Sequence, residues 1–380
     1  MQPPPETSFN DSPEPETLTA ALADYLGAAV ERLRVLASGW ETTLYEFALG
    51  ARTELLNNVD VGMPLVLRFY PSAAAAEKGA REYRIISHLS ASGYPVPRPL
   101  LFEPRPSAVG APFLVMERLR GGPLFAIRSF PQAFKTFSLG FLGFVREQAR
   151  LHRIALSGAA LKELSGALAT KRLEPSAGQA VPTRDASEVS AAARLLDRAL
   201  VTVATRVEQG PLPGLAEAAA FLRQRAAQFG DGPTSVVHMD YHPQNVLVEG
   251  PRVTGVIDWA GATTGDRHFD AATTSLILAT SAMEHPVWMR DNLAGRNLRR
   301  TFCALYVALY HAIAPMEFKR LHFYQGLAGA LRLSMLGMMR VRGPQSVGFR
   351  AGASAEVTPA VLRLLSRYAA RKIGTPVDVP

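Results

Sequence analysis

The sequence predicts an α+β protein with two lobes, a small β-rich N-terminal lobe and a larger, mostly helical C-terminal lobe. Two observations lead to this fold class. Five short stretches with strand-like spacing, separated by Gly, Asn and Asp, precede residue 119 and enclose one helical stretch. After Gly121-Gly122-Pro123, apolar residues recur mainly at helical spacing. The 380 residues suffice for one large two-lobed domain or for two ordinary domains.

The N-terminal lobe is expected over residues 18–119. Apolar residues at helical spacing predict a first helix from Leu18 to Ala28. A longer helix from Ala73 to Ser92 has one apolar side and Gly93 as its end. Runs of alternating residues bounded by turn signals predict strands at Arg32 to Ser38, Thr42 to Leu49, Leu65 to Tyr70, Arg98 to Glu103 and Pro112 to Arg118.

The C-terminal lobe is expected over residues 120–372, with tails at 1–17 and 373–380. A polar connector with Pro and Gly is expected from Leu173 to Arg184. Helices are predicted at Phe137 to Ile154, at Ala186 to Phe229 with an interruption near Gly210 to Gly214, from Ala271 to Arg340 and at Pro359 to Lys372. Three short strands are predicted at Ser235 to Met239, Asn245 to Glu249 and Val253 to Asp258.

The composition describes a globular protein, since 48% of the residues are hydrophobic and 19% are charged. A single cysteine, Cys303, excludes a disulfide within the chain and a cysteine-based zinc site. It lies in an apolar run and is expected to be a buried structural thiol rather than a nucleophile.

Residues Met1 to Thr17 are rich in Pro and Glu and resemble neither a signal peptide nor a transit peptide. A disordered tail is expected there. The most apolar stretches, Ala271 to Met283 and Phe302 to Met316, are shorter than a membrane span requires. We therefore expect a cytoplasmic protein without a membrane partner.

The net charge of +8 suits an anionic ligand such as a nucleotide, and it is also compatible with loose nucleic-acid binding. No aromatic residues interleave with the basic clusters, which lie at Arg290, Arg296, Arg299 and Arg300 and at Arg340 and Arg342. A solvated helix face is therefore the favoured interpretation of these clusters, and no nucleic-acid partner is expected.

The most informative segment is His238-Met239-Asp240-Tyr241-His242-Pro243-Gln244-Asn245, which is followed by Val256-Ile257-Asp258-Trp259. An Asp followed by four residues and an Asn, with a second Asp after an apolar run, is the arrangement that phosphoryl transfer needs. We expect Asp240 to be the catalytic base that orients and deprotonates an attacking hydroxyl. Asn245 and Asp258 would supply hard oxygen ligands for Mg2+, which holds the nucleotide phosphates.

The histidines of this segment, His238 and His242, leave a transition-metal site open as an alternative. With no cysteine nearby, and with the carboxylates spaced for magnesium, a zinc or iron site is the less favoured interpretation. His238 is instead expected to be a hydrogen-bonded structural residue that holds the loop. For Asp240, the alternative is an Asp that caps a turn.

Three features of the N-terminal lobe are candidates for nucleotide binding. Arg68 ends an apolar strand and Glu82 lies on the next helix, and such a pair holds the α- and β-phosphates in kinase-like enzymes. Taken alone, the pair would also fit a surface Arg and Glu. Gly39 connects the first two strands in a turn that could cover the nucleotide, although it lacks the G-x-G-x-x-G pattern. Glu117 and Leu119, where strands give way to helices, could offer main-chain groups to an adenine edge.

Together these residues resemble the aminoglycoside phosphotransferase family, also called the phosphotransferase enzyme family, within the protein-kinase-like fold. The resemblance runs from about Ala37 to Leu276. Members have H-x-D-x-H-P-x-N where this chain has His238 to Asn245, and I-D-[WF] where it has Ile257-Asp258-Trp259. Shorter resemblances lie at Tyr94-Pro95-Val96-Pro97, at Leu151-His152, and at Gly265-Asp266 with Phe269-Asp270, which resemble a G-D-x-x-x-D element.

The resemblance implies a bilobal protein-kinase-like fold and a small-molecule O-phosphotransferase with ATP (or GTP) and Mg2+ as cofactors. It makes Asp240 the catalytic Asp, Asn245 and Asp258 the magnesium ligands, and Glu82 the partner of the phosphate-binding cation. Arg68 is a departure, because many members have Lys at this position. Arg keeps the charge and can bind phosphate bidentately, but it is bulkier than Lys.

The expected partner is a small hydroxylated acceptor, and family members act on choline, homoserine, sugars, macrolides and others. A polycationic aminoglycoside would need several carboxylates, whereas Met289 to Arg320, expected on the acceptor side, is basic. A neutral or anionic hydroxylated metabolite is therefore favoured. The alternative function is a nucleotide-binding pseudokinase or scaffold without phosphotransfer, which Arg68 and the missing second loop glycine suggest. No oligomeric state is predicted.

Overall fold

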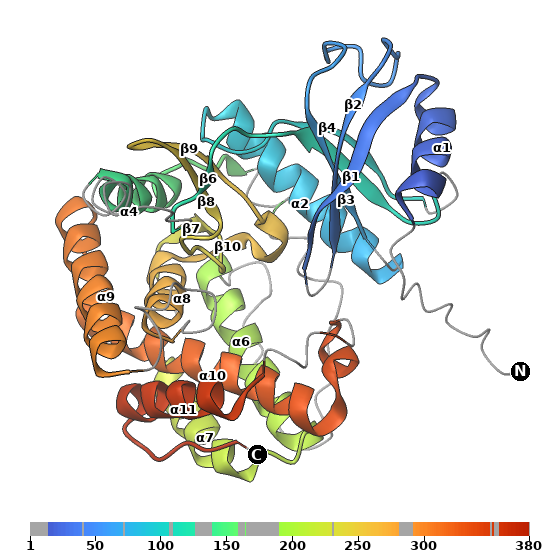
Figure 1. Cartoon of the computed structure of the whole chain (residues 1–380). Coiled ribbons are helices and arrows are strands. Elements are labelled where there is room, and N and C mark those ends of the chain that lie inside the picture. Colours follow the sequence, from blue (N-terminus) through green and yellow to red (C-terminus); the bar gives the residue numbers. More distant parts are fainter. Residues whose placement is uncertain are drawn as a thin grey trace, which may run out of the picture. The chain divides into compact units, whose positions relative to one another are not determined.

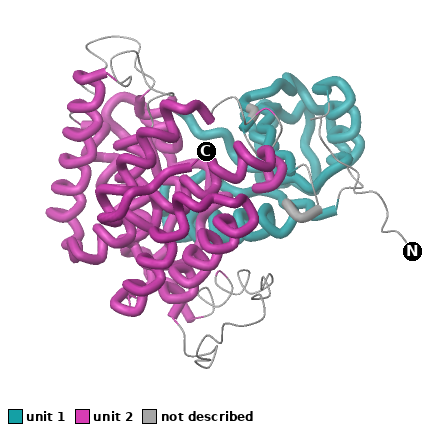
Figure 2. The backbone as a smooth tube through the Cα atoms, turned by 90° about the horizontal axis from the view of Figure 1, so that it is seen from below, with its two compact units in different colours: residues 1–120 teal, residues 121–380 magenta. Residues whose placement is uncertain are grey.

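The computed structural model of the chain describes residues 14–39, 42–70, 73–105, 109–125, 139–158, 164, 190–229, 232–280, 292–349, 352 and 357–379. The chain divides into two compact units, residues 1–120 and 121–380 (Figure 2). Among the described residues, unit 1 contains a sheet and two helices and unit 2 is mostly helical, which confirms the α+β class. The connector predicted at Leu173 to Arg184 and most of the tail predicted at Met1 to Thr17 lie outside the described residues.

Unit 1 contains a five-stranded antiparallel sheet in the order β1–β2–β3–β5–β4 (Figure 1). The strands are β1 (Val30–Ser38), β2 (Thr43–Leu49), β3 (Leu65–Phe69), β4 (Pro99–Glu103) and β5 (Phe113–Glu117). Successive side chains of a strand point to opposite faces of a sheet. Leu65, Leu67 and Phe69 of β3 therefore share one face, and Arg68 points to the other.

The apolar face of β3 belongs to the core of unit 1. Alternate residues of β2 and β5 extend this core, and α1 (Pro15–Leu26) adds Leu18, Leu22 and Leu26, which are one helical turn apart. The helix begins at Pro15, earlier than the sequence predicts, because proline is well suited to the first helical position.

Helix α2 (Ala73–Ala91) lies on the side of the sheet to which Arg68 points, since Glu82 of α2 contacts Arg68 directly. Gly79 permits this close approach. A Cβ at Gly79 would come within 2.8 Å of the rings of Tyr70 and Phe102. These two rings meet edge to face, with their centroids 6.4 Å apart. The helix and the sheet therefore approach closely just one turn before Glu82.

Unit 2 contains two small sheets beside its helices (Figure 1). One consists of β6 (Gly122–Pro123), β8 (Val246–Glu249) and β9 (Arg252–Val256), and the other of β7 (Thr234–Val237) and β10 (Thr263–Asp266). The sequence predicts β7, β8 and β9 but only a break at β6 and no strand at β10. These two short segments lack an alternating pattern, and they pair with β8 and β7 only in the folded chain.

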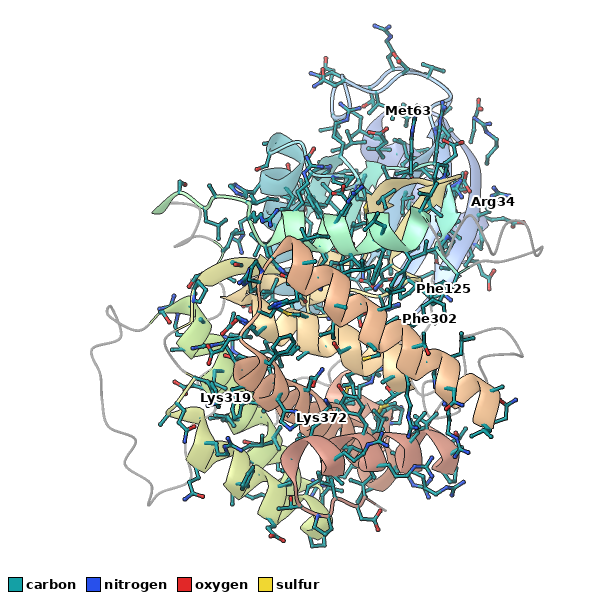
Figure 3. All side chains as sticks on the ribbon, turned by 90° about the vertical axis from the view of Figure 1, so that its left-hand side faces the viewer. Arg34, Met63, Phe125, Phe302, Lys319 and Lys372 are labelled. Carbon is teal, nitrogen blue, oxygen red and sulfur yellow. The ribbon has the colours of Figure 1, made fainter. Side chains whose placement is uncertain are left out.

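The helices of unit 2 surround α10 (Phe318–Arg342), which is buried on most of its circumference. It contacts α6 (Ala191–Gln209), α8 (Arg267–Thr280) and α11 (Pro359–Ile373). The other helices are α4 (Phe141–Leu151), α7 (Ala216–Ala226) and α9 (Leu293–Ile313), with 3-10 turns at Pro213–Leu215, Trp259–Gly261 and Pro344–Val347. Phe302 of α9 lies against Phe125, with ring centroids 5.9 Å apart (Figure 3).

Three further observations concern sequence predictions for unit 2. The thiol of Cys303 is half-buried and donates to the carbonyl of Ser275 at 3.6 Å, and burial raises its pKa, as expected for a structural thiol. The segment after α11, predicted as a tail, is packed: Val377 and Val379 are buried and the N–H of Asp378 donates to the carbonyl of Gly214. None of the helices in the described ranges is long and apolar enough to cross a membrane.

Gly121→Ala should destabilise the protein strongly. Gly121 has φ +95°, and a Cβ there would lie 2.6 Å from the main-chain oxygen of Val248. The added methyl group would meet rigid backbone in a conformation that L-residues avoid. We expect the free energy of unfolding to fall by about 2–4 kcal/mol, measured by urea denaturation.

Gly122→Ala is the matched control, because no heavy atom lies within 4 Å of the Cβ position at Gly122. It should change the free energy of unfolding by less than about 1 kcal/mol. Equal losses in the two variants would contradict the argument from φ and close approach.

Candidate active site

Two paired strands bring the expected catalytic and metal-binding residues of unit 2 together. Asp240 and Asn245 lie in the loop between β7 and β8, and Asp258 follows β9. β8 and β9 pair antiparallel, and the N–H of Ile257 donates to the carbonyl of Asn245 at 2.9 Å. The pairing therefore places Asn245 next to the residue that precedes Asp258.

Asn245 holds Asp240 directly. Its Nδ2 donates to the main-chain oxygen of Asp240 at 3.0 Å and to the carboxylate Oδ2 at 3.2 Å. Asn245 is buried, whereas 39% of the Asp240 side chain is exposed. The amide thus fixes the carboxylate in place while leaving it accessible from solvent.

His238 is a structural residue of this loop. Its Nε2 lies 3.0 Å from the carbonyl of Ile257, and its Nδ1 accepts the N–H of Asp240 at 3.3 Å. Burial lowers its pKa, and the charges of Asp270, Asp240 and Asp258 oppose this only in part. A neutral His238 that donates from Nε2 satisfies both contacts. Within the described ranges, no group of three or more His, Cys, Asp or Glu side chains could hold a metal ion.

His242 lies near the same carboxylate oxygen of Asp240 that Asn245 contacts. Its Nε2 lies 3.5 Å from Oδ2 of Asp240, and its Nδ1 accepts the N–H of Gln244 at 3.3 Å. Burial by itself would raise the pKa of Asp240. The hydrogen bond and charge of His242, with the charge of Arg332, outweigh burial and bring the pKa well below its ordinary value. Asp240 is therefore ionised at neutral pH.

Two residues at this site have left-handed backbone. Met239, directly before Asp240, and Asp258 both have φ +64°. The sequence predicts strands that run to Met239 and to Asp258, but β7 ends at Val237 and β9 at Val256. A residue with positive φ cannot continue a strand, and for a non-glycine residue this conformation costs about 1–3 kcal/mol. The surrounding structure must therefore hold both residues in place.

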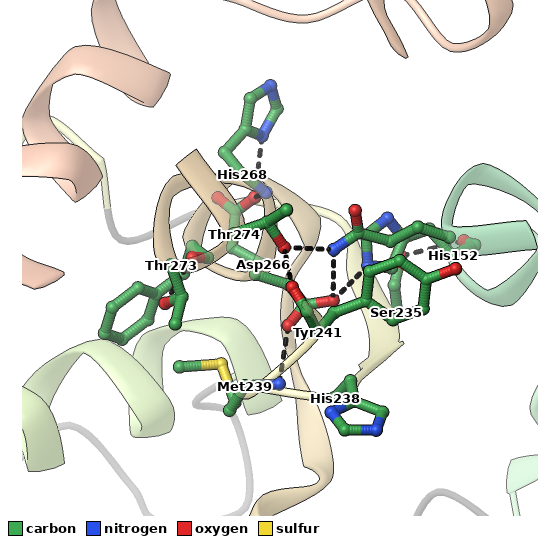
Figure 4. Close-up of polar contacts among 12 residues, drawn as sticks. His152, Ser235, His238, Met239, Tyr241, Asp266, His268, Thr273 and Thr274 are labelled. Carbon is green, nitrogen blue, oxygen red and sulfur yellow. Dashed lines mark hydrogen bonds and ion pairs between the residues drawn. The ribbon is translucent and has the colours of Figure 1, made fainter. Parts of the chain in front are cut away.

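Helix α8 holds the residues on both sides of Asp240. The carboxylate Oδ1 of Asp270 accepts the N–H of Met239 at 2.5 Å. The hydroxyl of Thr274 donates to the carbonyl of Tyr241 at 2.8 Å, as Figure 4 shows for these labelled residues. Both contacts are to main-chain atoms, so α8 fixes the path of the loop through Asp240.

The sequence points to Asp270 only within a resemblance to a G-D-x-x-x-D element, and Thr274 and Arg332 are not predicted from it. A weak signal was available for α8. Asp270 and Thr274 lie one turn apart in a helix that is otherwise largely apolar, so both face the same partner. Neither the spacing nor the composition reveals that this partner is the loop around Asp240.

In unit 1, Arg68 and Glu82 form a buried ion pair. Nη1 of Arg68 donates to Oε1 of Glu82 at 2.9 Å, and the hydroxyl of Tyr70 donates to Oε2 at 2.9 Å. The side chains of Arg68 and Glu82 are 8% and 2% exposed. The surface alternative for this pair is therefore wrong, because strand register turns Arg68 towards α2.

The other residues expected to bind the nucleotide are spread along the sheet of unit 1. Gly39 lies in the β1–β2 turn, where its N–H donates to the carbonyl of Thr42 at 3.0 Å; the two residues between them lie outside the described residues. Glu117 ends β5, and its N–H donates to the carbonyl of Arg98, so this N–H is not available to a ligand. Leu119 is half-buried in the irregular segment that follows.

Strand register separates these residues into two groups. Residues near the β1–β2 turn lie beside the ends of β3 and β5 that carry Phe69 and Phe113. Glu117 pairs with Leu65 at the opposite end. The length of β5 puts these two ends roughly 13 Å apart. Gly39 and Arg68 therefore belong to one end of the sheet, and Glu117 and Leu119 to the other.

Residues 32–315, which are most of the chain, match the profile of the phosphotransferase enzyme family. The chain belongs to this family. The match contains Asp240, Asn245 and Asp258 in unit 2 and Arg68 and Glu82 in unit 1. The family resemblance inferred from the sequence is therefore confirmed.

Solved structures of aminoglycoside phosphotransferases share the fold of this family member. One, assigned as an aminoglycoside phosphotransferase of Ralstonia eutropha JMP134, is 18% identical with a TM-score of 0.58, and the match covers 94% of this chain and 98% of that chain. A ternary complex of an APH(4)-Ia variant with ADP and hygromycin B is 19% identical with a TM-score of 0.51, covering 93% and 99%. The streptomycin–ATP complex of APH(2")-IIa is 15% identical with a TM-score of 0.54, covering 89% and 97%. The bilobal protein-kinase-like fold is thus confirmed.

A curated relative is the acyl-CoA dehydrogenase family member 11 of Gallus gallus. It is 26% identical over 216 residues, which are 56% of this chain. The chain matches only 25% of that relative's length. The similarity therefore concerns one part of a much longer protein.

Glu82→Ala should destabilise the protein by about 3–5 kcal/mol, because it leaves the charge of Arg68 buried without its carboxylate. Glu147→Ala removes the matched surface partner of Arg150, in a pair whose side chains are 21% and 50% exposed. That control should lose at most about 1 kcal/mol. Urea denaturation of both variants measures the difference, and a small loss for Glu82→Ala would show that the buried pair contributes little.

Stability should also decrease as the pH falls below about 6.5, the ordinary pKa of histidine. Burial lowers the pKa of His238 in the folded protein, so the unfolded chain takes up a proton in this range that the folded chain does not. The stability that this difference in the pKa of His238 contributes is fully present above about pH 6.5, and it is lost as the pH falls towards the pKa of His238 in the folded protein. Urea unfolding between about pH 8 and pH 5 measures this slope.

His238→Gln should reduce that slope. His322, whose pKa is also lowered by burial and by Lys372 and Arg225, supplies a second contribution, and His322→Gln measures it separately. An unchanged slope in His238→Gln would show that His238 does not titrate differently in the folded and unfolded states.

Proposed function

We propose that the protein is an ATP- (or GTP-) and Mg2+-dependent phosphotransferase that moves the γ-phosphate of a nucleotide to a hydroxyl group of a small molecule. The observation that carries the proposal is the contact of Asn245 with the ionised, accessible carboxylate of Asp240, beside Asp258. These residue types are the ones that phosphoryl transfer requires of a catalytic loop. Family membership supports the same reaction.

Asp240 would act chiefly by orientation. Its lowered pKa makes it a weak base, so it accepts the hydroxyl proton only as the bond to phosphorus forms. The carboxylate can hold the acceptor hydroxyl in line with the γ-phosphate, and correct placement of reactants contributes much of the rate in such reactions. The bond from Asn245 prevents the carboxylate from rotating away.

Asn245 and Asp258 fit a magnesium ion in this role. Magnesium prefers oxygen donors, and these residues provide an amide oxygen and a carboxylate at one end of the β8–β9 hairpin. The Nδ2 of Asn245 faces Asp240, so its Oδ1 lies on the other side of the amide group. Bound Mg2+ would neutralise the negative charge of the nucleotide phosphates.

Unit 1 would bind the nucleotide. An elongated nucleoside triphosphate needs a cation for its phosphates and main-chain groups for its base, at a distance from each other. Arg68 and the Gly39 turn lie at one end of the sheet, and Glu117 and Leu119 lie at the other. Glu82 and Tyr70 would hold the guanidinium of Arg68 in place for the phosphates. The structures of relatives with ADP or ATP support nucleotide binding.

The acceptor would be a neutral or anionic hydroxylated metabolite. Within the basic segment Met289 to Arg320, Arg299 is buried and Arg320 is paired with two carboxylates, so fewer cations than the sequence suggests face solvent. Arg300 and Lys319 are exposed.

The name of the Gallus gallus relative refers to acyl-CoA dehydrogenases. Acyl-CoA esters that carry a hydroxyl group are anionic and therefore belong in an acceptor screen beside sugars, amino alcohols and antibiotics.

Asp240→Ala should abolish phosphate transfer while ATP still binds. We expect the transfer rate to fall about 100-fold or more, the usual contribution of a positioned acid–base group. Acceptor-stimulated release of ADP measures the rate, and isothermal titration with ATP and Mg2+ measures binding. Asp24→Asn, an exposed change on α1, is the control and should leave both unchanged. Full transfer by Asp240→Ala would refute the proposed role.

The alternative is a nucleotide-binding pseudokinase or scaffold without phosphotransfer. This alternative is favoured by Arg68, which stands where many family members have Lys. A thermal-shift assay with ATP and Mg2+, followed by measurement of slow ATP hydrolysis, separates the two functions. Stabilisation by ATP without any turnover across a broad acceptor screen would favour the scaffold. Turnover that depends on Asp240 would exclude it.

A further inference from the structure

Two tyrosines of α9 make matched contacts with Gln148 of α4 and with His152, which directly follows α4. Tyr306 and Tyr310 are one turn apart, and so are Gln148 and His152. The hydroxyl of Tyr306 donates to Oε1 of Gln148 at 2.6 Å, and the hydroxyl of Tyr310 lies 2.5 Å from Nδ1 of His152. All four side chains are buried. The two helices are therefore joined by two polar contacts in the interior of unit 2.

Both contacts continue to Asp270. Nε2 of Gln148 lies 3.0 Å from Oδ2 of Asp270, and Nε2 of His152 lies 2.9 Å from the same oxygen. Gln148 also donates to the hydroxyl of Thr274 at 2.9 Å. When the hydroxyl of Tyr310 donates to Nδ1 of His152, Gln148 and His152 act alike: each accepts a hydrogen bond from a tyrosine at one end and donates to Asp270 from the other.

Each tyrosine hydroxyl can thus orient the group that it contacts. A hydroxyl that donates to Oε1 keeps the amide nitrogen of Gln148 turned towards Asp270. A hydroxyl that donates to Nδ1 keeps the ring proton of His152 on Nε2, which faces Asp270. Without these hydroxyls, the amide of Gln148 can flip and His152 can adopt its other tautomer.

The network ends at the two residues that flank Asp240. Asp270 holds the N–H of Met239, and Thr274 holds the carbonyl of Tyr241. Met239 has left-handed backbone, so its conformation depends on contacts of this kind. A change in the orientation of the Asp270 carboxylate would therefore alter the direction in which Asp240 points.

Packing alone does not require the two hydroxyls. The ring of Tyr306 lies beside that of Phe144, with centroids 6.1 Å apart, and the ring of Tyr310 lies 5.8 Å from that of His152. Phenylalanine would preserve these ring contacts. The hydroxyls instead contact acceptors that lead to the loop around Asp240.

We propose that Tyr306 and Tyr310 are positioning residues for phosphoryl transfer, through which α9 sets the orientation of the loop that carries Asp240. This inference rests on the proposed function for its kinetic consequence. Its structural consequence, a tighter hold on the main chain at Met239 and Tyr241, does not depend on the reaction.

The variants Tyr306→Phe and Tyr310→Phe of the full chain test the proposal. Each should lower kcat about tenfold, because a small misplacement of a reacting group reduces the rate more than it reduces binding. The Kd for ATP with Mg2+ should stay unchanged. Hydrogen–deuterium exchange of a peptide that spans residues 239–241 should accelerate in both variants, while exchange in unit 1 stays as in the wild type.

Tyr368→Phe is the matched control. Tyr368 is a buried tyrosine of α11, and within the described ranges its hydroxyl has no hydrogen-bond partner. This variant should keep the wild-type kcat and exchange. A double-mutant cycle of Tyr310→Phe with His152→Gln adds a second control, since two residues on one path should show a non-additive effect on kcat.

Wild-type kcat and wild-type exchange in Tyr306→Phe and Tyr310→Phe would overturn the proposal. So would faster exchange throughout the protein with weaker ATP binding, which marks a general loss of stability. If the wild-type protein transfers no phosphate to any acceptor, the proposed function fails, and local exchange at residues 239–241 still decides whether the hydroxyls hold the loop.

Discussion

Asp270 carries a negative charge in the interior of unit 2, where none of its side chain is exposed, and an ion in such a place is costly unless donors surround it. In the part of the chain that the structure describes, Asp270 contacts three such groups: the N–H of Met239 and the side chains of Gln148 and His152. Burial by itself would raise the pKa of Asp270, but the hydrogen bonds from His152 and Gln148 outweigh burial and lower this pKa, so the carboxylate stays ionised. The need to satisfy this one buried carboxylate therefore ties α4 and α8 to the loop around Asp240, and α9 joins them through its contacts with Gln148 and His152.

The same constraint explains how strained backbone persists at the site. Met239 and Asp258 adopt left-handed conformations that are costly for residues other than glycine. Met239 is held by Asp270, and Asp258 follows β9, which is paired with β8. Because both strands end just before these residues, the chain can turn and present two carboxylates and one amide at the same place. Rigid neighbours thus maintain a geometry that the local sequence would not adopt by itself.

Unit 1 also contains buried charges, and here they are satisfied by forming an ion pair. Arg68 and Glu82 are both withdrawn from solvent, and the hydroxyl of Tyr70 occupies the second oxygen of Glu82. Close approach of α2, which Gly79 allows, brings the carboxylate within reach of the guanidinium. An arginine held in this way presents a fixed planar group, suited to bidentate contact with phosphate. The departure from lysine is therefore compatible with the proposed nucleotide-binding role.

The sequence by itself determined what depends on short-range pattern: the order of strands and helices in unit 1, the helices of unit 2, and the spacing of Asp240, Asn245 and Asp258. The strands and helices follow from the local periodicity of apolar residues. The spacing of the three site residues follows from a short sequence motif. Only the tertiary structure decided the pairing of β6 and β10, the burial of Arg68, the use of the Glu117 N–H within the sheet, and the hold of Asp270 and Thr274 on the loop. Each joins residues far apart in the chain, and periodicity tells which side of a helix or strand is buried but not which distant atom it meets.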